Sequence, residues 1–355
     1  MDTPVAHLRL TAQHLVSDLF DTPEEVVRHM GAIQAQDYGQ ALWAIASRTK
    51  NCTIADVEKA VADGKIVRTW PMRGTIHFVL PENARWMVDL SATRMVRADG
   101  TRQKQLGLNP AILENSRQVA IKALKGGKKL SRPDILRALN EAGISTDTQR
   151  GYHILWHLTQ TGTLCIGPTE NKQQTFVLLK DWAPHASQLS REKSLAKLAS
   201  MYFYSHGPAT LVDFAWWGGL TQADARASLN AVKDNFAVKI IGKDEYYMQP
   251  GLKPAMSHNT LLLAGFDEYL LGYRSREHVV HSEGLLKIVP GKNGIFLASI
   301  ARDGQLVGTW KRTIKPKKIT IAIHTFVPEK TIKKELAPTL ERYAHYIGLP
   351  LEYEE

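Results

Sequence analysis

Cysteine is scarce in this sequence, which has only Cys52 and Cys165 among its 355 residues. Two thiols that far apart exclude a disulfide framework and the paired-cysteine pattern of structural zinc sites. Long apolar runs are absent as well, since no stretch approaches the roughly 18 residues that cross a bilayer. The first residues, Met1-Asp2-Thr3-Pro4, lack the charged start and apolar run of a secretory signal. We therefore expect a cytoplasmic protein without membrane contact.

The motifs of several common enzyme classes are also missing. The chain has no Gly-x-x-x-x-Gly-Lys loop, no His-Glu-x-x-His and no Gly-x-Ser-x-Gly, the signatures of nucleotide-binding loops, zinc proteases and serine hydrolases. Gly126-Gly127-Lys128-Lys129 is similar to a phosphate loop in composition only, because no predicted strand precedes it. We expect neither a cofactor nor a metal ion.

Acidic residues are outnumbered, since 35 Asp and Glu stand against 45 Lys and Arg, for a net charge of +10. The bases are clustered: ten lie from Arg94 to Arg132 against two acids, and five lie from Lys311 to Lys318 against none. Clustered positive charge favours a polyanionic partner, above all nucleic acid, because neutralising phosphates releases counterions. Total charge alone leaves open a basic protein that has no such partner.

The pattern of helix and strand signals repeats three times along the chain. The copies, at about residues 5–90, 112–180 and 190–250, each predict helices followed by two short strands joined by a tight or basic loop. Three helices and a hairpin are the winged-helix arrangement, a relative of the helix-turn-helix that commonly binds DNA. The alternative is a set of winged helices that serve as protein-interaction modules.

Local signals predict where these elements begin and end. Thr22-Pro23-Glu24-Glu25 combines a Thr N-cap, Pro at the first helical position and Glu three residues after the cap. Ser131 and Thr221 open helices in the second and third copies. The predicted strands are 66–70 and 75–80, 164–166 and 176–179, and 238–241 and 245–249, with a polar loop at 168–174 in the second pair.

The pattern changes after about residue 257. Runs rich in Ile, Val, Leu and Phe predict strands at 261–264, 285–290, 294–302, 305–311 and 319–326. A helix at about 329–346 would cover them. The predicted fold is therefore α+β, with three tandem winged helices and a small C-terminal antiparallel β-barrel. The predicted domains are 1–90, a basic helical connector at 91–111, 112–185, 186–256 and 257–355.

Two glutamines separated by one small residue, Gln34-Ala35-Gln36, follow the first helix signals. A cationic and aromatic hairpin comes later in the same copy: Arg68-Thr69-Trp70-Pro71-Met72-Arg73-Gly74-Thr75-Ile76-His77. Neither amide can ionise, so any chemistry at the glutamines would proceed by orientation and hydrogen bonding. The alternative is that the glutamines cap backbone carbonyls or face solvent.

Residues around these two segments are candidates for accessory and DNA-binding roles. Arg68 and Arg73 could each donate bidentate hydrogen bonds to a phosphate, although one of them could form a local ion pair instead. The accessory candidates are Asp37, Trp70 and His77. Each also has a structural alternative: Asp37 could be a solvated acid, Trp70 a core residue, and His77 a histidine whose hydrogen bonds are satisfied within the fold.

Further cations lie in the C-terminal part. Arg274 and Arg276 follow Asp267 and Glu268 around a Gly-Tyr turn, where opposite charges at this density indicate an internal ion-pair network. A groove-facing role for the two arginines is the alternative. A later basic loop could hold a phosphate backbone or form a solvated charged face. Its DNA-binding candidates are Lys311, Arg312 and Lys315.

Together these segments resemble the AlkZ-like DNA glycosylases, a winged-helix family that unhooks interstrand crosslinks and excises N7-alkylated purines. The resemblance covers almost the whole chain and implies three winged helices in a C-shaped clamp, followed by a small barrel. It also implies that Gln34 and Gln36 are catalytic. Relatives usually carry a bulkier apolar residue at the position of Ala35, which bears on the shape of the pocket. The other segments that carry the resemblance are Gly207-Pro208-Ala209-Thr210, Phe214-Ala215-Trp216-Trp217-Gly218-Gly219-Leu220 and Phe266-Asp267-Glu268-Tyr269-Leu270-Leu271-Gly272-Tyr273-Arg274.

The implied activity fits a pair of amides. A cationic N7-alkylated purine departs as a neutral base, so two amide oxygens could suffice to position water and stabilise the developing sugar cation. We expect a monomeric, monofunctional DNA glycosylase of base excision repair, acting on double-stranded DNA with alkylated purines or crosslinks and nucleoid-associated when bound. The alternatives are a non-catalytic winged-helix DNA-binding protein or transcription regulator, and a protein-interaction scaffold.

Overall fold

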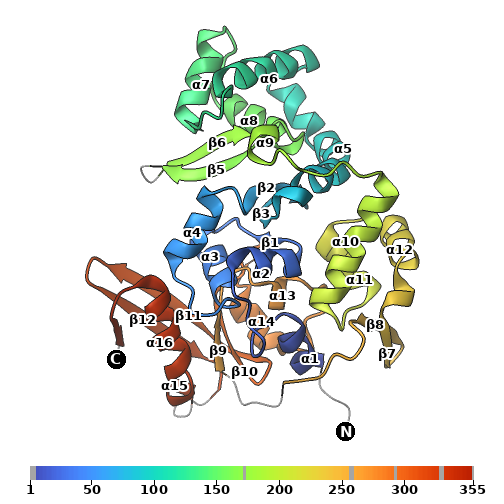
Figure 1. Ribbon diagram of the computed structural model, residues 1–355, viewed down its shortest axis with the longest axis vertical. Helices are drawn as coiled ribbons and strands as arrows, with labels where there is room; N and C mark the ends of the chain where they lie inside the picture. Colours follow the sequence, from blue (N-terminus) through green and yellow to red (C-terminus); the bar gives the residue numbers. More distant parts are fainter. Residues whose placement is uncertain (1–4, 171–172, 256–259, 292–293, 328–331, 354–355) are drawn as a thin grey trace. The chain divides into compact units, whose positions relative to one another are not determined.

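The computed structural model describes residues 5–170, 173–255, 260–291, 294–327 and 332–353. Within these ranges the chain forms two compact units. Unit 1 combines Met1–Val57 with Leu195–Glu355, and unit 2 is Glu58–Ser194. Two helices, α4 (Ile54–Ala62) and α10 (Arg191–His206), contain the points at which the chain passes from one unit to the other (Figure 1).

Unit 2 contains helices beside an antiparallel sheet. Its strands lie in the order β3-β2-β5-β6-β4, so the two hairpins predicted for separate modules share one sheet. Arg68 of β2 lies opposite Ile166 of β5 and joins them. The elements are β2 (Val67–Met72), β3 (Thr75–Val79), α5 (Pro81–Gln105), α6 (Pro110–Leu124), β4 (Leu130–Ser131), α7 (Arg132–Glu141), α8 (Arg150–Gln160), β5 (Leu164–Glu170), β6 (Gln173–Leu178) and α9 (Leu179–Trp182).

The turns and caps of unit 2 follow from its sequence. Ser131 caps α7 by accepting from the N–H of Asp134, as its position predicts. Arg73 and Gly74 turn the first hairpin with φ angles of 54° and 67°. The predicted polar loop at 168–174 is shorter than expected. Strand pairing continues to Glu170 and resumes at Gln173, because the backbone pairs regardless of side-chain polarity.

The core of unit 2 lies between its helices and this sheet. Leucine and isoleucine side chains of α6, α7 and α8 form a buried cluster with those of β5 and β6. Trp70 and Ile76 of the first hairpin pack against the same cluster. Contacts of this kind fix the hairpin to the helices of the unit.

Unit 1 contains the N-terminal and C-terminal segments of the chain. Thr22 and Glu25 form the predicted capping box at the start of α2, and Thr221 caps α12 as predicted. The elements are α1 (Val5–Ala12), α2 (Pro23–Met30), β1 (Ile33–Gln34), α3 (Tyr38–Ala46), α11 (Leu211–Gly218), α12 (Gln222–Asn230), the 3₁₀ turn η1 (Lys233–Asn235), β7 (Ala237–Ile241), β8 (Asp244–Met248), β9 (Thr260–Leu263), α13 (Glu268–Leu271), α14 (Ser282–Ile288), β10 (Ser299–Arg302), β11 (Gln305–Lys315), β12 (Lys318–Thr325), α15 (Ile332–Glu335), α16 (Ala337–Ile347) and β13 (Leu351–Tyr353).

The C-terminal sheet of unit 1 has the strand order β13-β12-β11-β10-β9. Among the described strands of this sheet, only β12 and β13 pair in parallel. In the described part of the chain no pairing joins β9 to β13, so the sheet is open and the predicted closed barrel is not confirmed. The helix α16 contacts β9 and β13, and Figure 1 shows it beside the strands it was predicted to cover. Residues 328–331, where that helix was predicted to begin, lie outside the described ranges.

Two strand predictions in this region need correction. The run 285–290 is not a strand, because Ser282–Ile288 forms the helix α14. Short apolar runs fit a strand or one side of a helix, and Leu286 is 71% exposed, as a residue on the outer side of α14. Of the predicted strand 294–302, only Ser299–Arg302 pairs as β10. The overall α+β class is confirmed.

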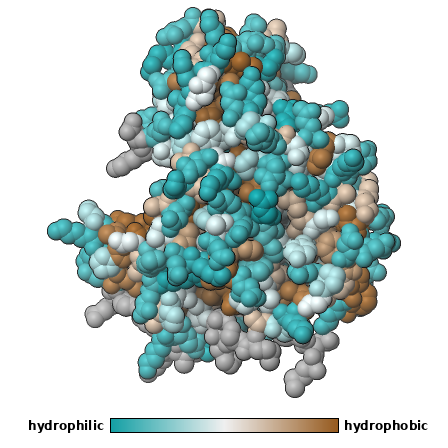
Figure 2. Space-filling view, in the orientation of Figure 1, coloured by the Kyte–Doolittle hydropathy of each residue, from teal (hydrophilic) through white to brown (hydrophobic). Residues whose placement is uncertain are grey.

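The third predicted hairpin, β7 with β8, forms as expected. Its register places Ile241 opposite Asp244 across a turn at Gly242, whose φ is 61°. Val238 and Ile240 on β7 are 50% and 62% exposed, and Figure 2 shows apolar surface over this part of the molecule. Ala209 forms an isolated bridge with Tyr247, which ties the hairpin to the segment before α11.

Candidate active site

The glutamine segment connects α2 to α3 in unit 1. Gly31 ends α2 with a φ of 78°, and its N–H donates to the carbonyl oxygen of Val27. Asp37 starts α3, because its Oδ1 accepts from the N–H of Gln40 at 3.1 Å. The two helix ends therefore fix both sides of Gln34-Ala35-Gln36.

The two glutamines lie in different surroundings. Gln34, in β1, is only 7% exposed, whereas Gln36 is exposed. The side chain of Ala35 between them is fully buried. The N–H of Gln34 donates to Oε1 of Glu268 at 3.2 Å, which holds the backbone at this point. Gln34 thus lies at the edge of the protein interior, and Gln36 lies toward solvent.

Asp37 has an observed structural function. Its carboxylate is the N-cap of α3, a role that stabilises a helix by roughly 1 kcal/mol. Gln40, one turn into the same helix, accepts from the N–H of Gly265 at 2.9 Å. These contacts fix the start of α3, and an accessory role of Asp37 in chemistry stays a prediction.

A pocket of about 570 Å³ opens beside the start of α3. One side comes from α3 and the other from the β11–β12 hairpin and the segment before β10. It brings the residue that follows Gln36 close to two of the predicted DNA-binding cations. The lining residues are Asp37, Gln40, Leu297, Ala298, Thr309, Trp310, Lys311, Arg312, Ala322, Ile323 and His324.

Arg312 is held close to α3 by its neighbours. Its Nη1 donates to the hydroxyl of Tyr343, and burial raises the pKa of Tyr343, so that hydroxyl stays protonated. A Cβ placed on Gly39 would come within 2.5 Å of Arg312 Nη2. Only glycine at position 39 therefore lets the guanidinium approach the helix this closely. The cation is pre-positioned beside the glutamine segment.

Other predicted cations of the hairpin face solvent. Lys311 and Lys315 are exposed on β11. Lys315 lies opposite Lys318, whose Nζ is 2.5 Å from Oε2 of Glu352. The exposed end of the hairpin is thus mainly positive, which suits an anionic polymer.

Arg274 and Arg276 lie at a tryptophan of α11. Each guanidinium carbon is 5.6 Å from the centre of the Trp216 ring, a cation–π distance. Arg276 also donates from Nε to the carbonyl oxygen of Leu270 at 3.1 Å. Trp216 is 38% exposed, while Trp217 is buried in the core. Arg274 is the exposed member of the pair.

The ion pairs around Asp267 differ from the predicted network. Asp267 accepts two hydrogen bonds from Arg48, at 2.8 and 3.1 Å, in the buried core of unit 1. Its neighbour Glu268 contacts Gln34, Trp217 and His206. Acids and arginines lie together at 267–276 in the sequence, yet Arg48, Gln34, Trp217 and His206 reach the two acids from distant segments.

The first hairpin lies in unit 2 and its candidates have local partners. Arg68, 6% exposed, donates to Oε1 of Gln174 at 3.3 Å. Arg73 Nη2 lies 3.1 Å from Nε2 of His77, and Nδ1 of His77 lies 3.0 Å from the carbonyl oxygen of Thr75. The latter contact places the proton of a neutral His77 on Nδ1, which leaves Nε2 to accept from Arg73. Such contacts favour the structural interpretation of His77.

Three residues near the candidate site were not predicted from the sequence. Glu268 and Tyr343 hold Gln34 and Arg312, and His324 lines the pocket. The position of Glu268 within the Phe-Asp-Glu-Tyr motif was a usable signal, since a carboxylate beside a buried strand needs hydrogen-bond donors. The sequence around Tyr343 and His324 contained no comparable indication that these residues lie near the site.

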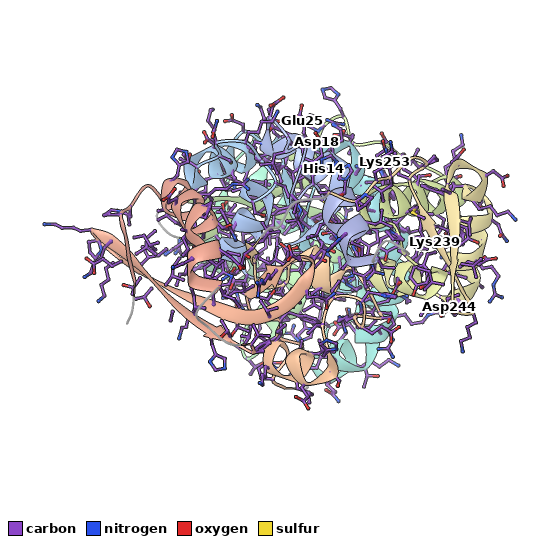
Figure 3. The ribbon with its side chains drawn as sticks, turned by 90° about the horizontal axis from the view of Figure 1, so that it is seen from below. His14, Asp18, Glu25, Lys239, Asp244 and Lys253 are labelled. Atoms are coloured by element: carbon purple, nitrogen blue, oxygen red, sulfur yellow. The ribbon has the colours of Figure 1, made fainter. Side chains whose placement is uncertain are left out.

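A second hollow of unit 1, of about 840 Å³, lies between α2 and α10. Phe20, His29, Tyr204 and Phe236 contribute its rings. Glu25 also lines it, and Figure 3 labels Glu25 together with His14 and Asp18. Nδ1 of His14 is 2.7 Å from the carbonyl oxygen of Asp18. None of the predicted site residues lines it.

The described residues contain no group of three or more His, Cys, Asp or Glu side chains that could hold a metal ion. Within the same ranges, no helix has both the length and the apolarity that crossing a membrane demands. Cys52 and Cys165 are buried and unpaired, and burial raises the pKa of Cys52 to about 12. Neither thiol is therefore poised as a nucleophile.

Comparison with known proteins gives one consistent result. The chain is 25% identical to an interstrand DNA cross-link repair glycosylase of Streptomyces sahachiroi, over 93% of each protein. Its structure superposes on that of Streptomyces sahachiroi DNA glycosylase AlkZ with a TM-score of 0.82, at 21% identity over the whole of both chains. The model of the family of AlkZ-like DNA glycosylases matches residues 27–346. This chain belongs to the AlkZ-like DNA glycosylases.

Proposed function

We propose that this protein hydrolyses the N-glycosidic bond of cationic N7-alkylated purines in duplex DNA, including purines in interstrand crosslinks. Gln34 and Gln36 would position the attacking water. The proposal takes its reaction class from the family and its substrate class from the chemistry of the two amides. The crosslink repair named for the Streptomyces relative supports the crosslinked substrate.

One observation carries the proposal: the glutamine segment lies directly before a helix start that forms one wall of a cationic pocket. Lys311 and Arg312 supply the positive charge that could hold phosphates, and Gln36 is exposed at the same end of α3. Phosphate contacts of this kind position a duplex without reading its sequence. The glutamines would then meet a nucleotide held by its backbone.

The chemical step needs little from the protein when the base is cationic. The water oxygen bonds to the anomeric carbon as the bond from that carbon to purine N9 breaks. The electron pair goes to N9 and cancels the positive charge of the base, while the water loses a proton to solvent. The products are a neutral purine and an abasic site. Two preorganised amide oxygens would accept from the water and face the developing sugar cation.

Contact of the duplex by three winged helices is part of the same proposal. Helices followed by a hairpin occur in the chain order α6-α7-α8 with β5-β6 and α10-α11-α12 with β7-β8, and α2-α3-α4 precede β2-β3. The exposed or hairpin-borne cations Arg73, Arg274, Lys311 and Lys315 are the proposed phosphate contacts, with Arg68, Arg276 and Arg312 in supporting positions.

Base release under single-turnover conditions tests the proposed function. Wild-type protein is incubated with a duplex that carries 7-methylguanine and with a duplex that carries an N7-linked crosslink. We expect abasic sites in the first and unhooked strands in the second. Gln34→Ala and Gln36→Ala should each slow release about 100-fold, the order of effect that loss of one preorganised polar group produces.

Gln222→Ala is the matched control, because Gln222 is an exposed glutamine at the start of α12. It should release base at the wild-type rate. If wild type binds duplex DNA tightly but leaves both lesions intact, the protein is a non-catalytic DNA-binding protein and the proposal is wrong. Equal release rates in wild type and both glutamine variants would show that the two amides have no role in catalysis.

A further inference from the structure

A buried carboxylate lies directly behind the first glutamine. Glu268 is 1% exposed and belongs to α13 in unit 1. Its Oε1 accepts from the backbone N–H of Gln34 at 3.2 Å, and its Oε2 accepts from Nε1 of Trp217 at 3.0 Å. Nε2 of His206 lies 3.5 Å from the same Oε2. The carboxylate therefore meets N–H groups on both of its oxygens.

The chemistry of these contacts requires a carboxylate. An ionised Glu is an acceptor at both oxygens, whereas Gln offers one acceptor and one donor. With Gln at position 268, either Gln34 or Trp217 would face an amide NH₂ instead of an oxygen. Burying a charge in this place is costly unless such donors surround it. The N–H donors around Glu268 therefore favour its ionised form.

The helix that carries Glu268 is itself fixed. Asp267 is the N-cap of α13 and accepts two hydrogen bonds from Arg48. Arg48 follows α3 and also donates to the carbonyl oxygen of Ala44 in that helix. Glu268 thus holds the backbone before α3, and its neighbour Asp267 holds Arg48 at the end of α3. The glutamine segment lies between these two attachments.

We propose that Glu268 is a positioning residue, which orients the peptide of Gln34 so that its side-chain amide meets the attacking water. The inference rests on the proposed function of Gln34. Rotation of the 33–34 peptide would redirect the side chain that follows it, because the Cα–Cβ bond direction is set by the backbone. Glu268 acts through this peptide and does not touch the substrate.

The test combines Glu268→Gln with variants of both glutamines. Glu268→Gln should slow single-turnover release of 7-methylguanine about tenfold, the rate equivalent of one lost hydrogen bond. Its affinity for the same duplex should stay at the wild-type value. In the Gln34→Ala background the substitution should cause no further loss, whereas in the Gln36→Ala background the tenfold loss should persist.

Trp217→Phe is the matched control. It removes the donor on Oε2 and keeps the bond from Glu268 to Gln34, so release should remain close to the wild-type rate. Wild-type rates in both Glu268→Gln and Glu268→Ala, the second of which leaves the Gln34 N–H without this acceptor, overturn the inference. So does a tenfold loss in Glu268→Gln that is equally large in the Gln34→Ala background. Failure of the proposed function differs from both, because wild type would then be inactive or Gln34→Ala would be fully active.

A measurement on the wild-type protein covers the case in which Glu268→Gln fails to fold. Amide hydrogen exchange should be slow at Gln34, whose N–H donates to Glu268, and faster at the exposed Gln36. Equal, rapid exchange at both amides would show that the Gln34 peptide is not held, and would overturn the inference.

Discussion

His29 lies near the end of α2, with its Nε2 2.6 Å from the carbonyl oxygen of Ala12. Its ring centre is 4.5 Å from that of His14 and 5.2 Å from that of Phe20. Burial lowers the pKa of His29 from 6.5 to about 4, in spite of the hydrogen bond to Ala12. The native protein therefore keeps a neutral imidazole at this position.

Stability should fall with acidification because of this residue. Below pH 6.5 the unfolded chain binds a proton at His29 that the native state binds only near pH 4. The contribution is thus complete above pH 6.5 and is lost as the pH falls toward 4, by at most about 1.4 kcal/mol per pH unit. Urea unfolding at pH 7.5 and 5.0 measures it.

His29→Gln should lose less stability between these two pH values than wild type loses, because Gln does not titrate and can still donate to Ala12. His345→Gln is the control, since His345 is exposed on α16. A pH dependence of His29→Gln as steep as that of wild type would contradict the prediction.

The β11–β12 hairpin carries three of the seven candidate DNA contacts. Lys311 and Lys315 are exposed on one strand of it, and Arg312 is turned toward α3. Exposed lysines that contact phosphates contribute to affinity mainly through counterion release. The hairpin should therefore control how strongly DNA binding depends on salt.

Replacing Lys311 and Lys315 by Gln should weaken binding to undamaged duplex and reduce the slope of log affinity against log salt by about two, one for each lost phosphate contact. Lys253→Gln is the control, because Lys253 is exposed outside the hairpin (Figure 3). Fluorescence anisotropy over a salt series gives the slopes. An unchanged slope in the double variant would show that the hairpin does not contact phosphates.

For helices and strands, patterns among neighbouring residues predicted the structure better than patterns that involve distant residues. The capping box of Thr22 and the turn at Arg73-Gly74 were correct, because a cap or tight turn depends on neighbouring residues. The run at 285–290 was predicted as a strand and is helical, since a short apolar run fits either structure. The contact of Glu268 with Gln34 spans 234 residues, so no local pattern could reveal it.

In unit 1 the two ends of the chain form one core. The ion pair of Arg48 with Asp267 joins segments 219 residues apart, and both side chains are buried. Gln13 adds to it, since its Oε1 accepts from Arg48 at 2.9 Å. Removing one partner of a buried pair leaves an uncompensated charge, which is far more costly than the loss of an exposed pair.

Asp267→Asn should therefore lower the free energy of unfolding by about 3 kcal/mol. Asp21→Asn is the matched control, because Asp21 forms an exposed pair with Lys50 at 2.8 Å and should leave the free energy of unfolding close to the wild-type value. Chemical denaturation monitored by tryptophan fluorescence compares the two variants. Equal stabilities would contradict the inferred importance of the buried pair.

The discontinuity of unit 1 has a consequence during synthesis. Gln34 emerges from the ribosome early, but the carboxylate that holds its peptide is added 234 residues later. At about 5–20 residues per second that delay amounts to roughly 10–50 s. The nascent chain therefore carries the glutamine pair for most of translation without the residue that fixes it. Unit 2 is complete before that residue is made, so the glutamine segment is among the last parts of the protein to reach its final form.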